Sequence, residues 1–117
     1  MYDLEQRTFL FSSNLISICN KLPSNIITNP LVSQVVRSGT SIGANYCEAN
    51  GSISKKDFRY KIFICKKESK ETVYWLKLLL TIYVYSKDLQ SLLDEADQLA
   101  RIFNKISLST PPEVSKF

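Results

Sequence analysis

Between Ser52 and Thr110 the chain contains neither proline nor glycine, the residues that most often end a helix. In the first part of this stretch, apolar or small residues recur at alternating spacings of four and three: Phe58, Ile62, Cys65, Ser69, Thr72, Leu76, Leu79 and Tyr83. This spacing places residues on one face of an α-helix, whereas a half-buried strand would alternate in steps of two. A helix that long must bury its apolar face against other helices, so we predict an all-α protein.

The same spacing recurs in three other segments. The predicted helices cover residues 3–22, 30–50, 54–86 and 89–107. Because their connections are short, we predict an antiparallel up-down four-helix bundle over residues 1–108, followed by a flexible tail over residues 109–117.

Local signals indicate where these helices begin and end. Asn29 and Pro30 favour an N-cap and a first helical residue, and Gly51 favours a helix end. Ser54 and Asp57 resemble a capping box at the start of the long helix.

The composition removes several kinds of catalytic site. The chain has no histidine, which removes Ser-His-Asp and Cys-His catalysis and the Glu-x-x-His pairs of di-iron bundles. Its three cysteines, Cys19, Cys47 and Cys65, are odd in number and lack C-x-x-C spacing, so we expect reduced thiols in the cytoplasm. The start lacks the pattern of a signal peptide, and no apolar run could span a membrane. We therefore expect no catalytic residue, no cofactor and no membrane partner.

All three glycines lie in one stretch, RSGTSIGANYCEANG, residues 37–51. A phosphate-binding loop would need a Lys-Ser/Thr pair after the second glycine or a preceding strand, and neither is predicted. A serine nucleophile would have no histidine as its base, which leaves only a lysine for that role. In a helix, Gly39 and Gly43 lie one turn apart on one face and cost roughly 1 kcal/mol each relative to alanine. We therefore predict that another helix packs closely against them.

This stretch also carries polar side chains, Asn45 and Glu48 among them, which need partners if they are buried. The predicted structural polar set is Arg7, Arg37, Asn45, Glu48, Lys67, Glu68, Glu71 and Trp75. Within it, Arg7, Arg37, Lys67 and the two glutamates of the long helix are the expected partners of Asn45 and Glu48. Glu48, Glu68 and Glu71 could instead hold Mg²⁺ or Mn²⁺, but ion pairs with arginine are far commoner, and we predict no metal site.

Basic residues gather on the long helix. The basic stripe consists of Lys55, Lys56, Arg59, Lys66, Lys70 and Lys77. From Lys55 to Lys70 there are seven basic and two acidic residues, a net charge of +5 that exceeds the +4 of the whole chain. Such a stripe is either a solvated face or a surface for nucleic-acid phosphates. Tyr60, Tyr74 and Tyr85 could add base stacking, although tyrosines of small bundles more often lie in the core or at its rim.

A second apolar line follows the long helix beside its main seam. It carries Ile64, Glu68, Glu71, Trp75, Leu78 and Ile82. One seam cannot bury both lines, so either neighbouring helices on both sides cover this one or a second subunit does. We favour a homo-oligomer, because an apolar surface that includes a tryptophan would promote association.

Several motifs together resemble one known family. They are Arg7-Thr8, Leu22-Pro23, Gln34-x-x-RSGTSIGAN, Glu48-Ala49, SKKDF at residues 54–58, KESKET-x-x-WL at residues 67–76, and Glu95-Ala96. Over nearly the whole chain, to about Ser107, the sequence is similar to the four-helix bundle proteins called 23S rRNA intervening-sequence or S23 proteins. It departs from them at packing positions such as Gly39, Tyr46, Cys47 and Ser69.

The resemblance implies a bacterial four-helix bundle that assembles as a homopentamer around a central channel. Genes of the family lie in insertions within 23S rRNA genes, and no enzymatic activity is established for it. A related branch comprises basic accessory proteins of diversity-generating retroelements, which are thought to bind reverse transcriptase and nucleic acid. We therefore expect a non-enzymatic protein that binds structured RNA or a ribonucleoprotein through the basic stripe. The alternative is a protein-interaction scaffold or accessory subunit without nucleic-acid contact.

Overall fold

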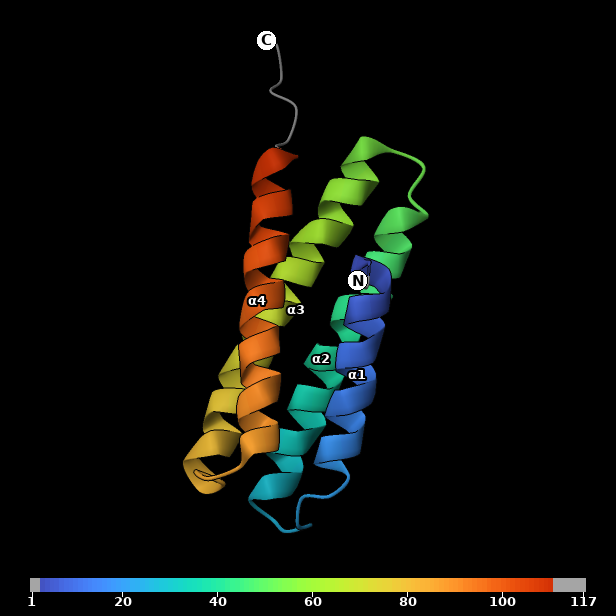
Figure 1. Ribbon diagram of the computed structural model, residues 1–117. Coiled ribbons are helices and arrows are strands. Elements are labelled where there is room, and N and C mark those ends of the chain that lie inside the picture. The colour runs from blue at the N-terminus through green and yellow to red at the C-terminus, as the bar shows by residue number, and fades with distance from the viewer. Residues whose placement is uncertain (1–2, 111–117) are drawn as a thin grey trace.

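The computed structural model describes residues 3–110, which form four helices and no strand (Figure 1). They are α1 (Leu4–Cys19), α2 (Thr28–Asn50), α3 (Lys55–Ile82) and α4 (Lys87–Ser109). Each helix packs against the next in sequence, and α4 also contacts α1. The prediction of an all-α four-helix bundle is therefore confirmed. The predicted flexible tail begins inside α4 at Ser109, and its residues 111–117 lie outside the described part of the chain.

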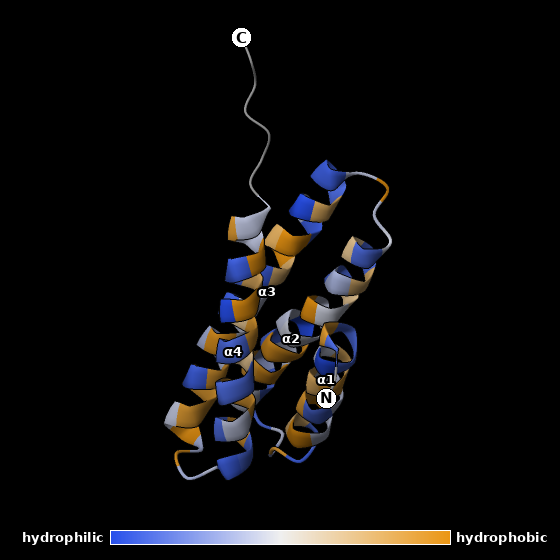
Figure 2. Ribbon diagram, turned by 45° about the horizontal axis from the view of Figure 1, so that its top comes forward, coloured by the Kyte–Doolittle hydropathy of each residue, from blue (hydrophilic) through white to orange (hydrophobic). Residues whose placement is uncertain are grey.

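The core forms where the predicted seams of the four helices meet. Each helix carries both hydrophobic and hydrophilic stretches (Figure 2). Leu15, Val35, Leu76 and Leu99, one from each helix, are completely buried. Since their seams all face inward, burial of apolar surface is the main force that holds the helices together. Among the described residues, no helix combines the length and hydropathy that a membrane span requires.

Polar groups inside the seams are hydrogen bonded within or between helices. Thr72 of α3 and Ser38 of α2 are both fully buried, and their hydroxyl oxygens lie 2.9 Å apart. Ser69 donates to the carbonyl oxygen of Cys65 at 2.7 Å. Over residues 3–110, no buried side-chain nitrogen or oxygen lacks a hydrogen-bond partner. The hydrogen bonds of these hydroxyls therefore offset the cost of removing them from water.

Helix α2 begins two residues earlier than the sequence predicts. Its N-terminus is held by Asn25, whose side-chain oxygen accepts from the backbone N–H groups of Ile27 and Thr28 at 3.1 and 2.8 Å. The predicted N-cap at Asn29 is therefore wrong, because an Asx turn upstream already binds these groups. Pro30 is tolerated inside the first turn, where backbone N–H groups have no intrahelical partner.

Single side-chain hydrogen bonds cap the starts of α3 and α4. Ser54 caps α3 by accepting from the N–H of Asp57 at 3.0 Å. The reciprocal bond of a capping box is not among the bonds of this cap. Ser86 caps α4. Helix α3 ends at Ile82, and a short connection takes the place of the last turn that the sequence predicts for α3. Gly51 closes α2 with an ordinary negative φ of −93°.

Helix α1 lies against the glycine face of α2. A Cβ atom added at Gly39 would lie 2.2 Å from Cδ2 of Leu15, and one at Gly43 would lie 3.1 Å from Oγ1 of Thr8. Leu15 and Thr8 are both buried. The absence of a side chain at Gly39 and Gly43 leaves room for them and so permits the close approach of α1 to α2.

The second apolar line of α3 is partly covered within the chain. Helix α3 packs against α2 on one side and α4 on the other. Glu68 is buried and Trp75 is half-buried against the core, whereas Ile82 at the helix end remains 41% exposed. Coverage within one chain therefore accounts for part of this line, and the homo-oligomer expected from the rest stays a prediction.

Candidate nucleic-acid interface

The basic stripe runs along the outer face of α3. Lys55, Lys56, Lys70 and Lys77 are exposed, and Arg59 and Lys66 are half-buried. In the described part of the chain, none of the six has a carboxylate oxygen within 4.0 Å of its charged nitrogen. The stripe therefore presents charge that no ion pair within residues 3–110 neutralises.

Lys61 does not join this surface, although it lies in the same basic run. Its ammonium group donates to Glu48 of α2 at 2.6 Å, and this hydrogen bond raises the pKa of Lys61. The pair links α2 to α3 and removes one cation from the outer face. Lys67, which the sequence assigns to the structural polar set, is exposed and has no ion pair within residues 3–110.

Aromatic rings lie in water beside the stripe. Tyr60, Phe63 and Tyr74 expose 60%, 54% and 57% of their surface. On a helical wheel they fall within about 60° of one another and border the basic stripe, with Lys56 and Lys67 among them. The expectation that such tyrosines lie in the core or at its rim is therefore wrong for Tyr60 and Tyr74. Sequence reasoning missed Phe63, which its position three residues after Tyr60 could have revealed.

The structural polar set divides into separate clusters. Between α2 and α3, Arg37 donates to the buried Glu68 at 3.2 Å and also pairs with Glu71. Glu71 in turn accepts from the indole N–H of Trp75 at 3.3 Å. This cluster ties the middle of α2 to the middle of α3.

A second cluster links α1 to α4. The guanidinium of Arg7 donates to both carboxylate oxygens of Glu95, at 2.7 and 2.8 Å, and to Gln98 at 2.8 Å. The hydrogen bond to Glu95 raises the pKa of Arg7. A bidentate pair of this kind fixes the relative position of two helices better than a single contact does.

The predicted partners of Asn45 and Glu48 are wrong. Asn45 donates to the carbonyl oxygen of Ser41 within its own helix at 2.8 Å, and Glu48 pairs with Lys61. Arg37 cannot reach Glu48, since eleven residues of helix separate them by roughly 16 Å along the axis. The carboxylates of Glu48 and Glu68 therefore serve different contacts. Over residues 3–110, no group of three or more Asp, Glu or Cys side chains is placed to hold a metal ion.

The three thiols are free, and they occupy different environments. Cys19 and Cys65 are buried, whereas Cys47 is exposed. Burial raises the pKa of Cys19 to about 11 and that of Cys65 to about 12, so both remain neutral at physiological pH.

The outward face of α1 exposes several large apolar side chains among polar ones. Phe9 and Ile16, seven residues apart on one side of the helix, are 74% and 52% exposed, and Leu10 beside them is 40% exposed. A hollow of about 440 Å³ on this face is lined by Phe9, Leu10 and Cys47 among others. No residue of the described chain covers these rings and methyl groups.

Comparison with known proteins relates both sequence and fold to one family. The sequence model of the family described as 23S rRNA-intervening sequence protein matches residues 2–105. The fold is similar to the 1.70 Å crystal structure of a protein of unknown function from the S23 ribosomal protein family of Bacteroides thetaiotaomicron VPI-5482. That similarity has a TM-score of 0.78 and 27% sequence identity, over 90% of this chain and 98% of the other. No curated protein matches the chain.

Proposed function

The chain belongs to the 23S rRNA-intervening sequence protein family, and on that premise we propose that it is a non-enzymatic bundle that binds RNA through the outer face of α3. The observation that carries this proposal is the basic stripe, six cations on one helix without ion-pair partners in the described chain. Phosphate groups are the partners that such a row of cations fits best.

The exposed aromatics favour this function over a merely solvated face. Charge alone would keep a helix surface hydrated, but Tyr60, Phe63 and Tyr74 leave apolar rings in water among the lysines. Rings interleaved with cations are typical of surfaces on which bases stack while phosphates pair with lysine and arginine. The cations of the basic stripe would contact phosphates, so this part of the binding would not depend on the base sequence.

A salt titration of RNA binding tests the proposal. A labelled RNA hairpin should bind near 50 mM salt, and log K should fall linearly with log salt, with a slope of roughly 0.7 to 0.9 for each phosphate contact. An RNA affinity that is undetectable near this salt concentration would rule out the proposal.

We also propose that the chain self-associates through the outer face of α1. Phe9, Leu10 and Ile16 form an apolar surface that no described residue covers. The resemblance of the sequence to pentameric bundle proteins supports this second proposal. Self-association would multiply the number of basic stripes in one particle and so strengthen RNA binding through multivalency.

A further inference from the structure

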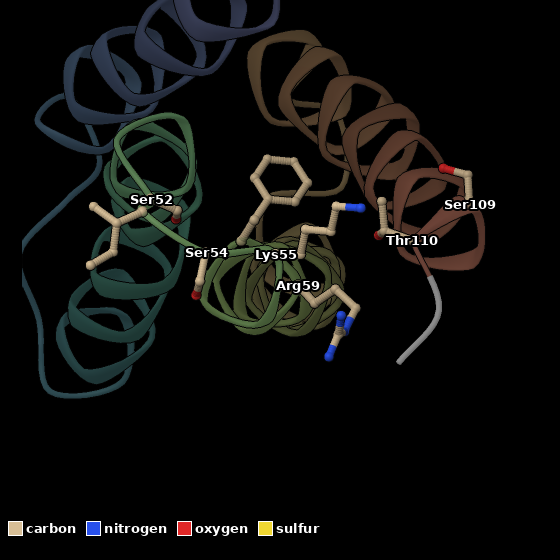
Figure 3. A pocket seen from close by; sticks show the side chains of 8 residues that line it. Ser52, Ser54, Lys55, Arg59, Ser109 and Thr110 are labelled. Carbon is tan, nitrogen blue, oxygen red and sulfur yellow. The ribbon is translucent and has the colours of Figure 1, made fainter. Parts of the chain in front are cut away.

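Two adjoining hollows lie where the first turns of α3 meet the end of α4, and Figure 3 shows the larger of the two. The larger has a volume of about 570 Å³ and is lined by Lys55, Phe58, Arg59 and Thr110 among others. The smaller, of about 280 Å³, is lined by Lys56, Tyr60 and Phe63 and shares Arg59 and Thr110 with the first. We call them the paired hollows.

The walls of the paired hollows combine rings and cations. Each hollow contains at least one aromatic ring, Phe58 in the larger and Tyr60 with Phe63 in the smaller. Each also contains a lysine of its own, and Arg59 stands between them. No residue that lines either hollow is acidic, so both are electropositive. A neutral or cationic ligand would gain nothing from these cations, whereas an aromatic anion would use both groups.

Hydroxyl groups on the walls have defined hydrogen-bonding capacity. Ser109 and Thr110 donate to the carbonyl oxygen of Ile106 at 2.9 and 2.8 Å, which leaves their oxygens free to accept. Ser54 accepts from the N–H of Asp57, and its own hydrogen is free to donate. Acceptors and donors therefore stand beside the rings, as the sugar and the base edges of a nucleotide require.

We propose that the paired hollows bind two successive unpaired nucleotides of the RNA, with one base in each hollow and the linking phosphate at Arg59. This inference rests on the proposed RNA binding and adds which part of the RNA the protein prefers. The larger hollow falls within the size range of small-molecule sites. Bases in a duplex are stacked and paired and cannot enter either hollow, whereas those of a loop or a single-stranded end can.

Fluorescence anisotropy on two matched RNAs tests this inference. One is a blunt RNA duplex, and the other is the same duplex with a 3′ overhang of about six uridines. At one salt concentration the overhang should tighten binding about tenfold, through base stacking on aromatic side chains and the extra phosphates. The double variant Tyr60→Ala/Phe63→Ala should lose most of this gain, measured as the ratio of the affinities of the same variant for the two RNAs.

Two further variants localise the effect. Tyr74→Ala removes a ring that is exposed to a similar degree on the same helix but outside both hollows, so it should keep the gain from the overhang. Thr110→Trp fills the shared wall and should abolish the gain. Each variant should show the circular dichroism spectrum of the wild-type protein, because the replaced side chains are exposed or lie at the end of α4.

The outcomes separate this inference from the proposed function. If the blunt duplex binds and the overhang adds nothing, the paired hollows do not bind nucleotides, but RNA binding by α3 stands. If Tyr74→Ala loses as much as Tyr60→Ala/Phe63→Ala, stacking occurs outside the hollows and the inference is overturned. If neither RNA binds, the proposed function and this inference both fall.

Discussion

At Gly39 the missing side chain sets how closely α1 approaches α2. A Cβ atom there would overlap Leu15, which is completely buried and cannot move without repacking the core. We therefore expect Gly39→Ala to lower the free energy of unfolding by about 1–3 kcal/mol, even though alanine favours the helix. Urea denaturation measures this change.

Two other glycines provide matched comparisons. At Gly43 the added Cβ would lie 3.1 Å from Oγ1 of Thr8, so Gly43→Ala should cost less than Gly39→Ala. At Gly51 the nearest atom would lie at 3.7 Å and φ is negative, so Gly51→Ala should leave stability nearly unchanged. Equal costs at Gly39 and Gly51 would contradict the role of close packing.

The buried thiols predict a loss of stability at high pH. Burial raises the pKa of Cys65 from its ordinary value of 9.0 to about 12, so the thiol is neutral in the folded chain when it would already ionise in the unfolded one. This contribution to stability is complete below pH 9 and is lost as the pH rises from 9 through about 12. Urea midpoints at about pH 8 and pH 10 should fall less in Cys65→Ala than in the wild-type protein.

The exposed thiol supplies the control for this experiment. Cys47→Ala should change the pH dependence less than Cys65→Ala does, because Cys47 is exposed and partial desolvation and a hydrogen bond to Glu5 raise its pKa less than burial raises that of Cys65. A pH dependence that is identical in all three proteins would show that Cys65 does not contribute.

Between the elements, the cluster around Arg37 joins α2 to α3. Glu68 is buried, and its carboxylate loses its cation if Arg37 is replaced. Arg37 is half exposed, which lessens the effect, so Arg37→Met should lower stability by about 1–2 kcal/mol. Adding Glu68→Gln in the Arg37→Met background should recover part of that loss, and the double-mutant cycle measures the coupling.

The ion pair between Arg101 and Asp97 is the matched control. It lies within α4, and its side chains are 80% and 50% exposed. Arg101→Met should therefore change stability by less than about 0.5 kcal/mol. A cost as large as that of Arg37→Met would mean that burial of the carboxylate is not what makes the α2–α3 cluster important.

At the scale of helices, spacing predicted more than local signals did. The alternating seam of α3 identified six residues that prove to be buried, because every fourth and third residue must face the same neighbours. The start of α2 was missed, since Asn25 and Asn29 are both good caps and only the path of the α1–α2 connection decides between them. The partner of Glu48 was missed because it depends on how α2 and α3 are aligned along their axes.

For the whole molecule, the exposed apolar face of α1 predicts self-association. Light scattering coupled to size-exclusion chromatography should give a mass several times the 13.4 kDa of one chain. The double variant Phe9→Asp/Ile16→Asp should shift the mass toward one chain, because two carboxylates would be desolvated in the interface.

A single exposed isoleucine serves as the control. Ile53, which is 99% exposed, belongs to the connection between α2 and α3 and not to α1, so Ile53→Asp should not change the mass. A wild-type protein that elutes as a single chain at high concentration would contradict self-association.

The candidate interface was predictable in part. The basic stripe follows from one helix and its period, so the sequence alone located it. The paired hollows could not be predicted, because they join Phe58 and Arg59 to Ser109 and Thr110, about fifty residues later. Only the packing of α4 against α3 brings these residues together.

The central claim is that the outer face of α3 binds RNA phosphates, and the salt dependence of binding measures it most directly. We expect Lys66→Gln/Lys70→Gln/Lys77→Gln to reduce the slope of log K against log salt by roughly two to three relative to the wild-type protein. Lys21→Gln/Lys105→Gln removes exposed cations outside α3 and should leave the slope unchanged. If both sets of variants reduce the slope equally, or neither does, the RNA does not bind at the basic stripe.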